Sequence, residues 1–112
     1  MTKKETDFDF IIIGAGGAGM SAAMYGARLG MKTLCLGASH GSELPLGGVI
    51  TTTNVVENYP GFIRLTGTEI ADKIREHAQS YPEVNLKEEK VELVKKESNH
   101  FICPNQQSLY IQ

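Results

Sequence analysis

The chain has 112 residues, which is enough for one domain with a modest core. Its 11 Lys and Arg residues against 13 Asp and Glu residues leave a net charge of -2, so charge indicates neither nucleic acid nor a cationic partner. No apolar run approaches the ~20 residues needed to span a bilayer, and Thr2–Asp7 lacks the apolar core of a signal peptide. We therefore expect a cytoplasmic protein with no membrane partner.

The first predicted element is a strand over Phe8–Ile13, followed at once by a glycine-rich turn. The continuous apolar run Phe10–Ile13, bounded by glycine, predicts a strand buried on both faces. Gly14, Gly16 and Gly19 then fit the G-x-G-x-x-G pattern. In that pattern the first glycine allows a tight bend, the second a close approach to a pyrophosphate, and the third close packing of helix on strand.

A helix is predicted directly after the turn, over the alanine-rich segment Ala18–Leu29, with Gly30 as its C-terminal stop. Free amides at the start of a helix, together with its dipole, bind phosphate groups. A glycine-rich turn can be purely structural, but here the strand before it and the helix after it are both present. This order favours a dinucleotide-binding site.

Thr33–Leu36 predicts a second strand, which would complete a βαβ unit with parallel strands. Cys35 within it is most simply a small buried apolar residue, because it forms no C-x-x-C and the other cysteine, Cys103, is distant. The dinucleotide fingerprint expects Asp or Glu near the end of this strand, where it binds a ribose hydroxyl. Gly37 and Ala38 stand there instead, which makes NAD the less favoured ligand.

The middle of the chain has no clean periodicity. Ala38–Leu46 is a predicted loop by its Gly, Ser and Pro content, and Gly47–Phe62 combines a glycine pair with hydroxyl and amide side chains. Such a segment can lay its backbone and short polar side chains along a flat ligand. It can equally be a β-prone surface connection that ends in a Pro-Gly turn, and composition alone favours this second alternative.

A second helix is predicted to begin at a capping box, because Thr66 and Glu69 stand three residues apart. Ile70 and Ile74 then recur at helical spacing on one face. His77 on this helix is more simply a packed or half-exposed residue than a metal ligand, since neither of the other two histidines stands at metal-ligand spacing from it.

The last part of the chain predicts short strands. Val84–Lys87 suits a third parallel strand, and an antiparallel meander with one solvent-facing side should follow over Lys90–Lys95, Phe101–Cys103 and Leu109–Ile111. The charged run Lys87–Glu97 is most simply a solvated strand face.

One segment carries a family resemblance. Gly47–Phe62 resembles the G-G-Q-L-T-T-T-x-x-V-E-N-[YW]-P-G stretch of low-molecular-weight thioredoxin reductases. Together with F-D-F-I-I-I-G-A-G-G-A-G and the helix after it, the likeness covers about residues 8–86, and the V-E-N-Y-P-G block is its most specific part. The resemblance implies an α/β fold, a Rossmann-like FAD-binding domain with a parallel sheet plus an antiparallel β-meander, and FAD as the cofactor.

The resemblance also implies which residues contact FAD. Two departures lower the expected affinity: Val49 stands where the family usually has glutamine, and the loop Ala38–Leu46 is longer than usual. The implied contacts are Gly14, Ala15, Gly16, Gly17 and Ala18 with the pyrophosphate, Gly37 and Ala38 with the adenosine ribose, and Gly47, Gly48, Val49, Thr53 and Asn58 with the flavin.

In the family that the chain resembles, the FAD domain continues past the position of Gln112 with a strand ending in A-T-G, and an NADPH domain then carries the redox C-x-x-C. We therefore expect residues 1–112 to be a partial FAD-binding domain, without an NADPH domain, catalytic residues or a metal site. Thioredoxin would be a partner only of a complete enzyme. The strand after Gln112 would pair beside Phe8–Ile13, so we expect the chain to self-associate and to bind FAD weakly if at all.

Three functional interpretations follow. The first is an N-terminal FAD-binding fragment of a thioredoxin-reductase-like flavoenzyme, in which electrons pass from NADPH to FAD to a disulfide. The second is a non-catalytic nucleotide-binding module or remnant, which flavin absorbance would separate from the first. The third is a piece of a related ferredoxin–NADP reductase, which the V-E-N-Y-P-G block disfavours.

Overall fold

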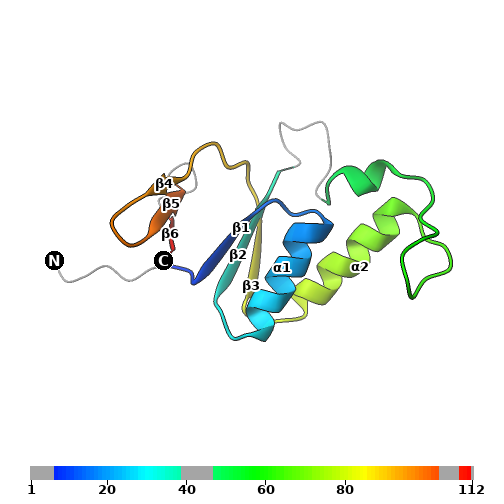
Figure 1. Cartoon of the computed structure of the whole chain (residues 1–112), viewed down its shortest axis with the longest axis horizontal. Helices are drawn as coiled ribbons and strands as arrows, with labels where there is room; N and C mark the ends of the chain where they lie inside the picture. The colour runs from blue at the N-terminus through cyan, green and yellow to red at the C-terminus, as the bar shows by residue number, and fades with distance from the viewer. Residues whose placement is uncertain (1–6, 39–46, 104–108, 112) are drawn as a thin grey trace.

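The computed structural model describes residues 7–38, 47–103 and 109–111, and it has the expected α/β architecture. A parallel sheet in the order β1-β2-β3 is covered on one face by two crossover helices, and a small antiparallel sheet lies on the other side of it (Figure 1). The elements are β1 (Phe10–Ile13), α1 (Gly17–Arg28), β2 (Thr33–Gly37), the 3-10 helix η1 (Val49–Thr52), α2 (Gly67–Gln79), β3 (Val84–Glu88), β4 (Lys95–Lys96), β5 (Phe101–Cys103) and β6 (Leu109–Ile111).

β2 is the buried strand of the parallel sheet. It pairs with β1 on one edge and with β3 on the other, and all five of its residues are buried. The prediction that the first strand would be buried on both faces is confirmed in part. Phe10 and Ile12 pack in the core under the helices and Ile11 packs on the opposite face, but Ile13 at the end of β1 is 55% exposed. Within the described residues β1 forms backbone pairs with β2 only, so β1 is an edge strand of this sheet.

The main core forms between the sheet and the two helices. Ile12 and Cys35 from the sheet pack with Met20 and Ala23 of α1 and with Ala78 of α2. Small side chains on both helices let them approach the sheet closely, and burying such apolar surface contributes about 25 cal/mol per Å². The helix predicted after the glycine turn and the second predicted helix are both confirmed.

Gly26, in the last turn of α1, lies against Phe10 of β1 and Thr33 of β2. A methyl group at this position would stand 2.7 Å from the ring of Phe10 and 2.9 Å from the hydroxyl of Thr33. Thr33 is fully buried, and its hydroxyl donates to the carbonyl of Met31. The absence of a side chain at Gly26 therefore sets how closely α1 approaches β1 and β2.

α2 begins with the predicted capping box. The backbone amide of Glu69 donates to the hydroxyl of Thr66 at 3.0 Å, and the Glu69 carboxylate accepts from the Thr66 amide at 2.8 Å. These hydrogen bonds hold the pKa of Glu69 below its ordinary value, because they favour the charged carboxylate. At the other end of the helix His77 is exposed, and its ring stacks on that of Tyr81.

The predicted strand over Lys90–Lys95 is mostly wrong, because only Lys95–Lys96 pairs, with β5. Residues 90–94 lack strand structure, although they alternate apolar and polar. Val91 packs against a second cluster, formed by Phe8, Leu34 and Leu36, while Leu93 is 52% exposed. The apolar half of the alternation is therefore only partly covered. β3, β5 and β6 are confirmed as strands, whereas nearly all of the loop predicted over Ala38–Leu46 lies outside the described residues.

No helix within residues 7–38, 47–103 and 109–111 is both long enough and apolar enough to cross a membrane.

We expect Gly26→Ala to lower the free energy of unfolding by about 1–2 kcal/mol, although alanine is the better helix former by ~1 kcal/mol. The added methyl must displace the Phe10 ring or the Thr33 hydroxyl. Urea unfolding followed by circular dichroism measures the change. Ser21→Ala, an exposed position on the same helix, is the control and should leave stability unchanged or slightly raised. Equal stability of Gly26→Ala and the natural chain would contradict this account of the packing.

Candidate functional site

The turn after β1 is fastened to β2 by both polar groups of Gly14. The Gly14 amide donates to the carbonyl of Leu36 at 2.7 Å, and its carbonyl oxygen accepts from the Cys35 thiol at 3.4 Å. Gly14 has a φ of +115°, in the region that favours glycine. The turn is therefore tied to the most buried strand of the sheet.

The start of α1 rests directly on this turn. A Cβ atom at Gly19 would lie 1.7 Å from the carbonyl oxygen of Gly14, so no side chain fits between helix and turn. The role expected for the third glycine of the pattern, close packing of helix on strand, matches this geometry. The same contact turns the Gly14 carbonyl towards α1 and Cys35.

The N-terminus of α1 is left open to an outside acceptor. Gly16 is the N-cap residue, no side chain caps the helix, and its first turn holds no acidic residue. The first intrahelical bond runs from the amide of Met20 to the carbonyl of Gly16, so the amides before it have no partner within the helix. Free amides at the positive end of the helix dipole form an anion-binding arrangement.

The glycine pair from the middle of the chain lies against this N-terminus. A Cβ atom at Gly16 would stand 3.4 Å from the carbonyl oxygen of Gly47 and 3.8 Å from the Cα of Gly48. Both residues of the pair have positive φ, +119° and +82°. Behind the pair, a Cβ at Gly47 would come within 3.3 Å of Ala71 in α2. The pair is thus wedged between the glycine turn and α2.

η1 continues from the glycine pair and is held by α2. The hydroxyl of Thr51 donates to the Gly48 carbonyl at 2.7 Å, and the amide of Gly67 donates to the Thr53 carbonyl at 2.9 Å. A Cβ at Gly67 would lie 1.7 Å from the carbonyl oxygen of Ile50, which makes glycine necessary there. Sequence reasoning missed Gly67, and its place inside the T-G-T-E capping box was the available signal.

The predicted site residues are only partly brought together. Val49 is 69% exposed at the start of η1, and Thr53 is exposed at its end. Asn58 is exposed in a loop that the paired backbones of Val56 and Leu65 close. The residues that gather at the start of α1 are Gly14, Ala15, Gly16, Gly17, Ala18, Gly47 and Gly48, with Gly37 next to the Leu36 carbonyl that holds Gly14. Their contacts with a cofactor stay predictions.

Both cysteines are buried free thiols, so the prediction of a buried Cys35 is confirmed. Burial raises the pKa of Cys35 to about 11 and also raises the pKa of Cys103. A thiol nucleophile reacts as the thiolate, which such burial disfavours. Neither cysteine has the environment of a redox-active group.

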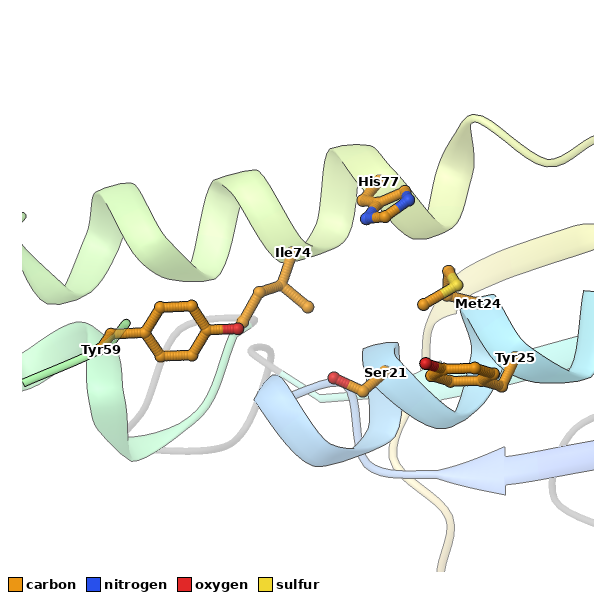
Figure 2. A pocket seen from close by; sticks show the side chains of 6 residues that line it. All are labelled: Ser21, Met24, Tyr25, Tyr59, Ile74 and His77. Atoms are coloured by element: carbon orange, nitrogen blue, oxygen red, sulfur yellow. The ribbon is translucent and has the colours of Figure 1, made fainter. Parts of the chain in front are cut away.

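A separate pocket of about 320 Å³ lies between α1 and α2 (Figure 2). None of the predicted site residues lines it. In the part of the chain that the structure describes, no three His, Cys, Asp or Glu side chains stand close enough together to hold a metal ion. The residues that line the pocket are Ser21, Met24, Tyr25, Tyr59, Ile74 and His77.

Comparison with known proteins agrees with this geometry. Residues 8–109 match the model of a family described as pyridine nucleotide-disulphide oxidoreductase. The chain belongs to this family. The members of this family are FAD-dependent. The uncapped start of α1 and the glycine pair are therefore the part of the chain to test for cofactor binding.

Several of the similar proteins are thioredoxin reductases. The chain is 44% identical over 78 residues to the thioredoxin reductase of Bacillus subtilis, covering 70% of this chain and 23% of that protein. It is 47% identical over 78 residues to a 34.2 kDa protein in the rubredoxin operon of Clostridium pasteurianum, covering 70% and 24%. The crystal structure of Lactococcus lactis thioredoxin reductase superposes with a TM-score of 0.82 at 32% identity, covering 94% and 33%. The chain spans about a quarter to a third of the length of these relatives.

We expect the stability of the chain to fall at alkaline pH because Cys35 is buried. The ordinary thiol pKa is 9.0 and the folded value is about 11, so the unfolded chain loses this proton first as the pH rises. The contribution is complete below pH 9 and is lost between pH 9 and 11, with an upper limit of about 3 kcal/mol.

Urea unfolding at a series of pH values measures this contribution, with Cys35→Ala as the comparison. The variant should lack that part of the decline in the free energy of unfolding. Parallel pH profiles for the two proteins would contradict the assignment.

Proposed function

We propose that the chain is an N-terminal FAD-binding portion of a thioredoxin-reductase-like flavoenzyme, with the pyrophosphate of FAD bound at the start of α1. One observation carries the proposal. The uncapped helix N-terminus and the glycine pair Gly47–Gly48 meet at Gly16, where the nearest atoms to a Cβ built at this position are backbone atoms of the pair. The 44% identity to Bacillus subtilis thioredoxin reductase supports the choice of family branch.

The residues present fit the group that the family implies. The turn Gly14–Ala18 offers amide donors without a competing carboxylate in the first helical turn. Gly37 and Ala38 would lie by the adenosine ribose, and Gly47, Gly48, Val49, Thr53 and Asn58 would lie by the flavin. FAD, when bound, supplies the electron-transfer chemistry, and the chain's own residues bind it and orient it. The side chain of Val49 would bring no polar group to the flavin.

In this proposal the chain contributes cofactor binding rather than thiol exchange. Disulfide reduction needs an accessible thiolate and a second cysteine within reach. Cys35 is fully buried, and burial raises its pKa and that of Cys103. An electron donor and a disulfide substrate such as thioredoxin would therefore be met by other parts of a complete enzyme, with electrons passing from NADPH to FAD to the disulfide.

We also propose that the chain self-associates through β1. Within the described residues β1 pairs only with β2, and Ile13 at its end is 55% exposed. An unpaired strand edge presents amides and carbonyls that another strand can satisfy, and the neighbouring apolar side chains add a hydrophobic term. Water can satisfy the hydrogen bonds of the free edge, so burial of the apolar side chains is the main driving force for self-association.

We expect Gly16→Val to weaken FAD binding by at least about tenfold without unfolding the chain. Gly16 has a φ of -81°, which valine tolerates, but its methyl groups would press on the Gly47 carbonyl and obstruct the approach to the amides. Flavin absorbance after equilibrium dialysis measures binding. Gly30→Ala is the control: it strains a positive φ at the far end of α1, where nothing lies within 4 Å, and should bind FAD as the natural chain does. A natural chain that binds no FAD, or a valine variant that binds it equally, would contradict the proposal.

We expect Ile13→Lys to shift the chain towards monomer, because a charge on the β1 edge opposes strand pairing. Light scattering across a dilution series gives the mass at each concentration. Ile63→Lys removes an isoleucine that is 95% exposed elsewhere, and it should leave the association unchanged. A natural chain that is monomeric at every concentration would rule out this contact.

A further inference from the structure

The end of β2 lacks the carboxylate that commonly binds the adenosine ribose in dinucleotide sites. Dinucleotide sites of this type place a carboxylate there to accept a hydrogen bond from the ribose, but this chain has Gly37 and Ala38. In the parallel register Gly37 pairs with Glu88, the last residue of β3. The carboxyl ends of β1 and β3 lie at the same end of the parallel sheet (Figure 1). Glu89 is the residue that directly follows β3.

The carboxylate of Glu89 is the exceptional polar group of the described residues. Its Oε2 atom is shut off from solvent, and it is the one buried side-chain oxygen or nitrogen among residues 7–38 and 47–103 without a hydrogen-bond partner. Leaving a buried acceptor unpaired is costly, more so when it is charged. Glu88 beside it is exposed, so the two neighbours differ in burial.

We propose that Glu89 accepts a hydrogen bond from a ribose hydroxyl of the adenosine half of a bound dinucleotide, supplying from β3 the carboxylate that β2 lacks. The inference rests on the proposed function. Adjacent parallel strands lie about 4.8 Å apart, a gap that a glutamate side chain spans. The terminal torsion of glutamate is broad, so either carboxylate oxygen can turn towards the ligand. An ionised carboxylate is an acceptor only and a hydroxyl can donate, so no proton moves.

This placement specifies the ligand class. Nucleotides with a free ribose 2′-hydroxyl, such as ADP and FAD, would satisfy the orphaned oxygen. Riboflavin and FMN lack the adenosine and would gain nothing from Glu89. A 2′-phosphate would bring a second anion against the carboxylate and would be rejected. The predicted preference is therefore for adenosine diphosphates whose ribose carries a free 2′-hydroxyl rather than a 2′-phosphate.

Binding of ADP and of 2′-deoxy-ADP to the full chain tests the inference by isothermal titration calorimetry. We expect Glu89→Gln to weaken ADP binding about tenfold. It should leave the weaker 2′-deoxy-ADP binding unchanged. Its unfolding midpoint in urea should equal or exceed that of the natural chain, because a neutral amide is less costly to bury. Glu88→Gln, the exposed neighbour, is the matched control and should bind both nucleotides as the natural chain does.

Equal ADP affinity of Glu89→Gln and the natural chain, or an equal loss in Glu88→Gln, would overturn the role of Glu89 while leaving FAD binding intact. A natural chain that binds neither FAD nor ADP would overturn the proposed function, and this inference with it.

Discussion

The burial of β2 on both faces and both edges is the constraint on which the rest of the structure depends. The strand holds β1 and β3 in parallel register, and its Cys35 face carries the two helices. Through the Leu36 carbonyl and the Cys35 thiol it also fixes both polar groups of Gly14. These hydrogen bonds to the buried strand hold the glycine turn in place, although the turn lies at the surface. A ligand bound there would meet amides that are already oriented, which reduces the ordering that binding requires.

Local signals made most of the fold predictable from the sequence. The apolar run before Gly14 and the three-residue spacing of Thr66 and Glu69 act within a few residues, so each can be recognised without knowing its neighbours. The misjudged features depend on contacts between distant segments. The 55% exposure of Ile13 could not be inferred, because an apolar run alone does not show which of its side chains the rest of the fold covers. The alternation in residues 90–94 could not be separated from a strand because Val91 packs on the core through tertiary contact.

The candidate site also combines features that local sequence spacing predicts with features that depend on contacts between distant segments. The spacing of Gly14, Gly16 and Gly19 indicated the anion-binding turn, whereas the meeting of Gly16 with Gly47 was implied only by the resemblance of the middle segment to a known family. Spacing could not have found it, since more than 30 residues separate the two. Glu89 was not among the candidates from sequence, because a fingerprint follows one strand at a time while parallel register aligns the ends of neighbouring strands.

The capping box of α2 makes one part of the candidate site sensitive to acidic pH. Its hydrogen bonds hold the pKa of Glu69 below the ordinary value of 4.5, so the carboxylate's contribution to the cap is complete above that pH and weakens as Glu69 is protonated on acidification. The residue just inside the cap, Gly67, holds the carbonyl of Thr53 and contacts Ile50, which fixes η1 beside the glycine pair. Fraying of the first turn of α2 would release that segment while β2 still held the turn at Gly14. Acid would thus loosen η1 and the glycine pair before the turn at Gly14, so the two parts of the candidate site would come apart in separate steps.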